Sequence, residues 1–451
     1  MGPNYHSPAP PELDAAFEGS SDRNPAEKKL DAWWKRLRDP SLNELIDEAL
    51  SQNYDLRIAQ ERLVEARTLR KQARSALFPS VSGKTAYTNI GLSETTDQYK
   101  LMSPFGLAFD QTEQWDLGLD TNWEIDLFGG NRRRVEAATA RLDATGEREN
   151  ATRLALVTEV VDAYYSLAGA RLQLDRVRAN IGIQTETVEQ VNARFSEGLG
   201  NELDLRRARA QLASTQSAAP PFQAAITAQL RRLSILLGRK PAYLDGRASK
   251  FRGFPDRLPM ITTGLPAELL VRRPDLRLAE RELAAATADI GVATANFYPR
   301  FILFGAPELQ SANSGDLFNI KSLAWQAGPR VEWSLFSSGR NKAILEGANS
   351  RQRQSLLAYE QAVLRAAGEV ESSLAQLHAE SDRLAALIRS VSENRVSTRL
   401  ATKLYREGMQ DFLSVLVEEQ RLIQAEISEV QSRTSLLSAW VALHRALGGG
   451  W

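Results

Sequence analysis

Two long stretches without proline, residues 105–219 and 330–451, constrain this chain more than any other feature. Proline removes a backbone donor and clashes with the preceding turn, so a helix rarely continues through it. The segment between the two stretches contains ten prolines. Long uninterrupted helices are therefore expected in two places, separated by a region of turns and shorter elements.

The first of these stretches carries a heptad pattern from the Gly129-Gly130 pair to Gly198. Apolar residues recur at alternating steps of four and three, as in the seam of a coiled coil. A helix of ~68 residues rises ~100 Å, which is longer than a compact domain accommodates. A second apolar seam lies beside the first, so neighbours are expected on two sides, as in the wall of a tube. The main seam is Leu156, Val160, Ala163, Leu167, Ala170, Leu174, Val177, Ile181, Gln184, Val188, Val191 and Phe195, and the second stretch has a looser version, Ala367, Val370, Leu374, Leu377, Ser381, Leu384, Ile388 and Val391.

The two halves of the chain share one plan. Residues 48–82 align without a gap on 268–302, and both segments contain Asp-Leu-Arg at matching positions. Further along, five residues recur at a constant offset of 210. The repeating unit is therefore about half the chain, much longer than a solenoid repeat. The five pairs are Trp115/Trp325, Gly118/Gly328, Phe195/Tyr405, Glu197/Glu407 and Gly198/Gly408.

Polar and apolar residues alternate almost strictly in residues 115–127, which predicts a β-strand with two different faces at about 113–127. The counterpart at 324–336 repeats the pattern, and a weaker strand candidate precedes each, at 79–91 and 299–307. A soluble antiparallel sheet with one wet face has the same period. The strand length and the tryptophans near the strand ends favour a membrane-spanning sheet with interfacial aromatic residues. These tryptophans are Trp115, Trp123, Trp325 and Trp333.

Four strands do not close around a lumen, so a membrane-spanning sheet requires several chains to share one barrel. The composition offers little for catalysis or cofactor binding, since there is no Cys and only three His. The 56 basic and 56 acidic residues balance, which argues against a nucleic-acid partner. We therefore expect no enzyme, cofactor or metal site.

Both long helices end in the same sequence device. Gly198 and Gly408 suit the left-handed position that terminates a helix, and Asn201 and Asp411 follow three residues later as helix N-caps. Each long helix is therefore expected to turn at a hairpin tip and return. Pro220-Pro221 should bend the first returning helix.

In combination these residues resemble the TolC family of outer-membrane factors, in its NodT-like and OprM-like lipoprotein branch. The resemblance covers essentially the whole chain and rests on motifs in a fixed order. They are Gly2-Pro3-Asn4-Tyr5, Trp33-Trp34, Asp39-Pro40-Ser41-Leu42, Trp123-Glu124-Ile125-Asp126-Leu127-Phe128-Gly129, Arg272-Arg273-Pro274-Asp275-Leu276 and Ala446-Leu447-Gly448-Gly449-Gly450-Trp451.

The resemblance implies a mixed α+β, mainly helical fold in which three chains form one twelve-stranded outer-membrane β-barrel, continued by an α-helical barrel in the periplasm. It implies a homotrimeric, passive, gated channel of a tripartite efflux pump that exports drugs or other small molecules. The implied partners are a periplasmic adaptor (membrane fusion protein), an inner-membrane resistance-nodulation-division transporter and outer-membrane lipid. The branch is anchored through an acylated cysteine, and Met1 stands in that neighbourhood, so an engineered start without the anchor is expected. A long coiled-coil scaffold without a channel is the alternative.

The family also implies roles for the hairpin tips, which close like an iris and meet the adaptor. A tyrosine–aspartate contact that closes the family's gate maps onto Tyr405 and Asp204. Gln410 replaces an arginine of the family's lock, and Ser414 and Val417 replace two acidic residues of the pore, so an acidic constriction would depend on Asp411. The expected gate is thus Asp204, Tyr405, Gln410, Asp411, Ser414 and Val417, and the expected adaptor contacts are Gly198, Leu199, Gly408 and Met409.

The expected layout has five parts. An extended N-terminal segment covers 1–40, and a C-terminal tail covers 448–451. The first repeat, 41–238, contains a long helix at 130–197 and a return helix at 201–237. An equatorial connector follows at 239–265, and the second repeat, 266–447, has its long helix at 340–407 and its return helix at 411–447.

Overall fold

The computed structural model describes residues 1–9, 11, 32–91, 93–105, 111–247, 251–255, 257–261 and 269–450. The predicted N-terminal segment, connector and C-terminal tail therefore lie partly outside the described residues. Contacts between residues divide the chain into two compact units, and each unit combines three separate segments of the sequence. The first consists of 1–8, 63–145 and 279–359, and the second of 9–62, 146–278 and 360–451.

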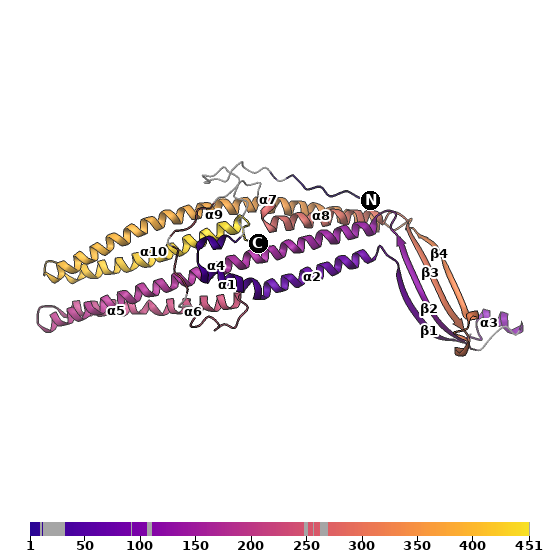
Figure 1. The fold of residues 1–451 in the computed structure, drawn as a ribbon, viewed down its shortest axis with the longest axis horizontal. Coiled ribbons are helices and arrows are strands. Elements are labelled where there is room, and N and C mark those ends of the chain that lie inside the picture. Colours follow the sequence, from indigo (N-terminus) through magenta and orange to yellow (C-terminus); the bar gives the residue numbers. More distant parts are fainter. Residues whose placement is uncertain are drawn as a thin grey trace. The chain divides into compact units, whose positions relative to one another are not determined.

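The first unit contains one antiparallel sheet in the order β1-β2-β3-β4 (Figure 1). Its strands are β1 (Ser80–Ile90), β2 (Thr112–Ile125), β3 (Arg300–Ser311) and β4 (Leu323–Glu332). The mainly helical fold with four strands is confirmed. The strand bounds differ from the expected ones chiefly at the ends of β3 and β4, where β3 continues to Ser311 and β4 stops before Trp333. Short helical segments between the strands are α3 (Asp97–Met102) and 3-10 turns at Ser103–Phe105, Ser314–Asp316 and Ile320–Ser322.

The long helices are α4 (Gly130–Ser196) and α9 (Arg340–Arg406), each of 67 residues. Each passes through both units, as do α2 (Tyr54–Ser75) and α8 (Pro274–Ala295). Among the described helices, none is long and apolar enough to cross a membrane.

The second unit holds the returning helices, which lie beside the long ones in Figure 1. The second return is one helix, α10 (Phe412–Ala446), whereas the first is interrupted at Ala218 and forms α5 (Glu202–Ser217) and α6 (Ala219–Leu236). The expected return helix at 201–237 is thus divided at the place where Pro220-Pro221 were expected to bend it, because these prolines fit only in the first turn of a new helix. The remaining helices are α1 (Pro40–Gln52), α7 (Leu269–Arg272) and a 3-10 turn at Trp33–Leu37.

The main core of the second unit is built where the α4 seams meet α1 and α10. Val160, Val161 and Ala163 are fully buried there, as the double seam predicts. Trp33 closes the core by stacking on His444 and donating its indole N–H to the Gly449 carbonyl at 3.1 Å. Trp33 thus connects the 3-10 turn before α1 to the residues that follow α10.

Candidate functional site

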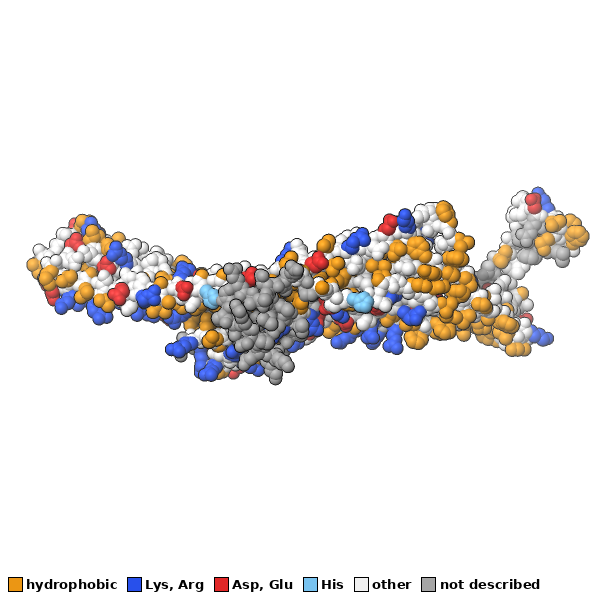
Figure 2. Space-filling model, turned by 90° about the horizontal axis from the view of Figure 1, so that it is seen from above, with side chains coloured by type: hydrophobic (Ala, Val, Ile, Leu, Met, Phe, Trp, Pro, Cys, Tyr) orange, Lys and Arg blue, Asp and Glu red, His pale blue; other side chains and the backbone are white. Residues whose placement is uncertain are grey.

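The register of the sheet places most of its large apolar side chains on one face. Leu117 lies opposite Thr85 on one side and Leu309 on the other, and Trp123 lies opposite Leu303. These residues share one face, and many are exposed despite being apolar. Figure 2 shows hydrophobic side chains gathered over the sheet. The apolar face includes Val81, Tyr87, Trp115, Leu117, Leu119, Trp123, Phe301, Leu303, Leu309, Leu323, Trp325 and Val331.

An exposed apolar face of this extent is unusual for a protein surrounded by water. Leu119 is 50% exposed, Val331 56% and Trp325 74%. The two tryptophans of the first half, Trp115 and Trp123, are eight residues apart, which is about 27 Å along a strand. Trp325 and Trp333 of the second half have the same spacing. That spacing is close to the ~25 Å apolar band of a transmembrane β-protein.

The tryptophans nearer the long helices are fixed in the same way in both halves. The indole N–H of Trp123 donates to the Leu77 carbonyl at 3.0 Å, and that of Trp333 donates to the Phe297 carbonyl at 3.1 Å. Both acceptors follow a helix, α2 or α8, just before the next strand. Each indole therefore holds a helix–strand junction while its ring stays partly exposed, as at a lipid–water boundary.

The opposite face of the sheet is polar and charged. Lys84 forms ion pairs with Asp120 at 3.5 Å and with Glu308 at 3.0 Å, Arg300 pairs with Glu124, and Arg330 pairs with Glu332. The alternation within one strand is enough to identify a polar face. Which charged residues form ion pairs, however, depends on the register between neighbouring strands. The full charged set on this face is Lys84, Asp116, Asp120, Glu124, Arg300, Glu308, Arg330 and Glu332.

The hairpin tips have the predicted backbone. Gly198 and Gly408 adopt φ values of 73° and 75°, which confirms the left-handed terminations. The amide of Leu199 bonds to the Arg194 carbonyl at 2.8 Å, and the corresponding bond from Met409 has the same span. This 6→1 bond closes a Schellman motif. Leu199 and Met409 are exposed apolar side chains at the two tips, being 67% and 65% exposed.

The predicted N-caps are also confirmed. The Asn201 side chain accepts from the Asp204 amide at 2.8 Å, and the Asp411 carboxylate accepts from the Ser414 amide at 3.1 Å and from the Ser414 hydroxyl at 2.7 Å. The hydrogen bonds from Ser414 lower the pKa of Asp411. Ser414 is thus tied to its own helix terminus, while Gln410 and Val417 are exposed.

Tyr405 packs where the two tips meet, against a small apolar cluster from four helices. Its ring lies 5.3 Å from that of Phe412, and the Arg194 guanidinium lies 5.1 Å from the ring centre. Burial raises the pKa of Tyr405, and Asp204 adds to the rise while Arg194 opposes it. Within this one described chain the Tyr405 hydroxyl makes no hydrogen bond to Asp204, whose carboxylate lies 3.8 Å from Arg207. The cluster is Val191, Leu205, Ala208, Ala401, Phe412 and Val415.

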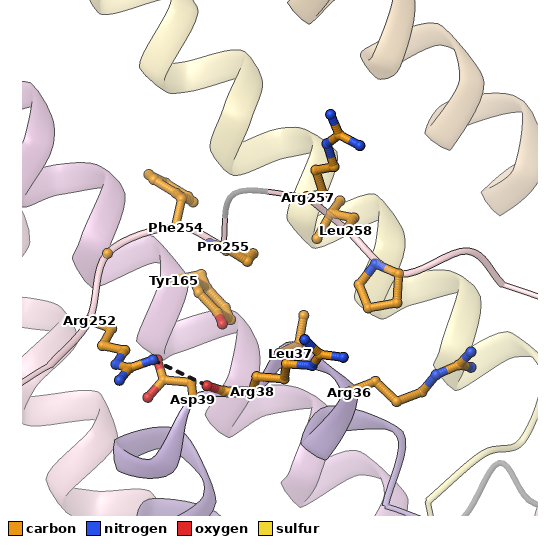
Figure 3. Close-up of a pocket in the computed structure, with 12 residues that line it drawn as sticks. Arg36, Leu37, Arg38, Asp39, Tyr165, Arg252, Phe254, Pro255, Arg257 and Leu258 are labelled. Carbon is orange, nitrogen blue, oxygen red and sulfur yellow. Dashed lines mark hydrogen bonds between the residues drawn. The ribbon is translucent and has the colours of Figure 1, made fainter.

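A cavity of about 1000 Å³ lies in the second unit, beside the 3-10 turn (Figure 3). Four arginines surround it, Arg36, Arg38, Arg252 and Arg257, and the Arg252 guanidinium donates to the Arg38 carbonyl. Its lining includes one acidic residue, Asp39, which caps α1 and accepts from the Tyr164 hydroxyl at 2.7 Å. The Asp39 carboxylate therefore has a structural role. In the described ranges, no group of three His, Cys, Asp or Glu is placed to hold a metal ion.

Comparison with known proteins agrees with this geometry. The family described as "Outer membrane efflux protein" matches residues 45–239 and again 265–449, so the duplicated halves are two copies of one domain. The chain is 32% identical over 421 residues to the toluene efflux pump outer membrane protein TtgF of Pseudomonas putida, covering 93% of this chain and 85% of the relative. It is 29% identical over 457 residues to the cation efflux system protein CusC of Escherichia coli, covering 100% and 95%.

A solved structure of the outer-membrane channel OprN superposes with a TM-score of 0.90 at 34% identity, covering 100% of this chain and 99% of the other. The alternating strands, the long duplicated helices and these matches point to the same class of protein. The chain therefore belongs to the outer membrane efflux protein family, with a TolC-like fold, and is an outer-membrane channel of an efflux pump.

Proposed function

We propose that three copies of this chain close one twelve-stranded barrel, each contributing its four-stranded sheet. The observation that carries this proposal is the exposed apolar face, which lipid would cover. In the described sheet, β1 and β4 each have one unpaired edge. Pairing of β1 in one copy with β4 in the next would satisfy these edges, because a closed barrel has none. The polar face, with its ion pairs, would then line the lumen.

The helical hairpins form the periplasmic end of this duct and its gate. Leu199 and Met409 supply exposed apolar side chains at the tips, where the hairpins of a periplasmic adaptor would dock. An inner-membrane resistance-nodulation-division transporter supplies the energy and chooses the cargo. The relatives named for toluene and for cations fit this division of labour, since the channels are similar while the exported compounds differ.

A lipid anchor next to the barrel is part of the proposal. The Met1 amino group donates to the Phe128 carbonyl at 3.1 Å, and Arg133 donates to the carbonyls of Met1 and Gly2. Residue 1 is therefore held beside Phe128, between β2 and α4. An acyl group on a cysteine in this neighbourhood would enter the lipid beside the apolar face.

The proposed gate contact joins Tyr405 and Asp204 in the closed channel. Both belong to the tip region, and Asp204 acts on Tyr405 electrostatically. The combined change Tyr405→Phe and Asp204→Ala should raise single-channel conductance in planar bilayers. An unchanged conductance would remove this pair from the gate.

Spin labelling tests the orientation of the sheet, and the absence of Cys makes single labels specific. Val81→Cys and Ser82→Cys place a nitroxide on opposite faces of β1, since neighbouring residues alternate. In lipid vesicles, the label at 81 should collide mainly with oxygen and the label at 82 with a water-soluble nickel chelate. Equal exposure of both labels to the chelate would contradict the barrel.

A further inference from the structure

The contact between α4 and α10 changes character along its length. Near the main core it is tight, because a Cβ added to Gly169 would lie 2.4 Å from the Thr434 hydroxyl. Toward the tips, buried polar side chains replace apolar ones. Gln173 donates to Gln431 at 3.4 Å, Asn180 donates to Glu426 at 3.3 Å, and Thr187 donates to Glu419 at 3.4 Å. We call these three pairs the polar ladder.

The polar ladder follows the heptad. Gln173, Asn180 and Thr187 are seven residues apart on α4, and Glu419 and Glu426 are seven apart on α10, running the opposite way. The Asn180–Glu426 and Thr187–Glu419 rungs therefore occupy equivalent positions of one antiparallel coiled-coil seam, whereas Gln431 follows Glu426 by only five residues. This seam joins the hairpin of the first repeat to the hairpin of the second, so it must loosen if the two hairpins move apart.

The two glutamates of the polar ladder differ in whether a basic side chain neutralises their charge. Glu426 receives two hydrogen bonds from the Arg395 guanidinium of α9, at 2.7 and 3.1 Å. Glu419 is 5% exposed, and the hydroxyl of Thr187 is the partner of its Oε1, while its Oε2 has none. The adjacent acid, Glu418, is paired with Arg421 on the same helix. Among the described residues, Glu419 is thus a buried carboxylate with no cation within ion-pair distance.

An unused hydrogen-bonding group lies on the same face of α4. Gln184 is 3% exposed, and neither its amide nitrogen nor its amide oxygen has a partner. It precedes Thr187 by three residues, and residues three apart lie side by side on a helix. Gln184 on α4 and Glu419 on α10 are therefore both buried in this seam with unsatisfied hydrogen-bonding atoms.

We propose that the polar ladder is a proton-responsive latch between the two hairpins, with Glu419 as the group that takes up the proton. The proposal rests on the proposed gating function of the hairpins. When Glu419 is ionised, the seam buries an uncompensated charge, which costs stability. When a proton from water joins the carboxylate, the charge disappears and the seam closes.

The surroundings of Glu419 support this direction. Burial raises the pKa of Glu419, and the Thr187 hydrogen bond opposes that rise. Because the folded-state pKa lies above the ordinary value, packing of the seam is strongest at low pH and weakens as pH rises through that raised pKa. The channel should therefore open more readily at neutral than at mildly acidic pH.

Single-channel recording of the intact protein from pH 8 to pH 5 tests the latch. Wild type should open severalfold less often at pH 5 than at pH 8. Glu419→Gln should open rarely at every pH, because the amide mimics the protonated acid. Glu418→Gln is the matched control and should follow wild type. If Glu419→Gln follows the wild-type pH dependence, the latch is wrong although the channel stands.

A second measurement does not depend on conduction. Spin labels at Ile183→Cys and Gln424→Cys, both exposed positions near the ladder, report the α4–α10 distance by pulsed electron resonance. The distance distribution should broaden from pH 5 to pH 8 in the wild-type background and stay narrow with Glu419→Gln. A distribution that responds to pH equally in both backgrounds would overturn the latch, whether or not the protein conducts.

Discussion

The ammonium group of Lys84 on β1 lies 3.0 Å from the carboxylate of Glu308 on β3, although strand β2 runs between them. The residue of β2 between them is Gly118, which pairs with Lys84 on one side and with Glu308 on the other. Because Gly118 has no side chain, Lys84 reaches across it. The polar face is therefore tied together over three strands at this level.

Gly118→Ala should destabilise the sheet. A Cβ at this position would lie 2.6 Å from the Glu308 Cβ and 3.1 Å from the Pro307 carbonyl oxygen, so β3 must shift. Overpacking of this kind costs about 1–3 kcal/mol. Thermal unfolding in detergent should show a lower midpoint. Gly305→Ala is the matched control, since a Cβ there meets nothing within 4 Å; equal effects of both changes would contradict this account of Gly118.

The charges on the polar face should make the channel prefer cations. Five acidic and three basic residues give a net charge of 3 − 5 = −2 per chain. Asp116 has a neutral partner, the Gln114 amide, at 2.9 Å. Asp116→Asn should therefore reduce the ratio of potassium to chloride permeability, measured from reversal potentials in a salt gradient. Glu113→Gln, on the opposite face of β2, should leave the ratio unchanged.

Asn201→Ala should loosen the first hairpin tip without unfolding the chain. The Asn201 side chain accepts from the Asp204 amide, and losing such a cap costs about 1 kcal/mol. Hydrogen exchange at Asp204 should become roughly fivefold faster, because 1 kcal/mol corresponds to about that factor. Asn201→Asp keeps a capping oxygen and should exchange like wild type. An unchanged rate in Asn201→Ala would show that water replaces the cap.

His444 should make the second unit sensitive to acid. Its ring is buried between Trp33 and Trp440, and burial lowers its pKa to about 4 from an ordinary value of 6.5. The neutral form is therefore favoured in the folded state, so this stability is complete above pH 6.5 and is lost as pH falls through about 4. The unfolding midpoint should decrease across that window.

Two variants isolate the contribution of this histidine. His444→Gln should be less stable at pH 7 but should lose less of its stability on acidification. His378→Gln alters an exposed histidine of α9 and should behave like wild type at every pH. Equal acid sensitivity in wild type and His444→Gln would assign the effect to other groups.

Local features of this protein were predictable from sequence, and those set by distant partners were not. Gly198 and Asn201 act within one turn of chain, so their residue types predict their conformations. Within this single chain, Phe195 and Ile388 of the predicted seams are 40% and 48% exposed, while Glu380, outside the predicted seam, is buried. Glu380 is satisfied by Ser432, 52 residues away, and such a partner has no signature in a heptad pattern.

The same limit applies to the candidate site. The polar face of β2 is readable from alternation, but the Lys84–Glu308 pair depends on register across 224 positions of sequence. Gln184 is the one polar residue in the predicted α4 seam, and the structure places it in the same stretch of α4 as the polar ladder. Glu419 carried no such signal, because an acid on a long helix is usually solvated.

The most direct test of the account is the mass of the detergent-solubilised protein by light scattering, corrected for detergent, with conductance measured on the same preparation in planar bilayers. The account predicts a particle three times the 50.0 kDa chain that forms stable pores. A particle of one chain's mass that stays in solution without detergent and does not conduct would contradict it, because the apolar face of the sheet would then face water.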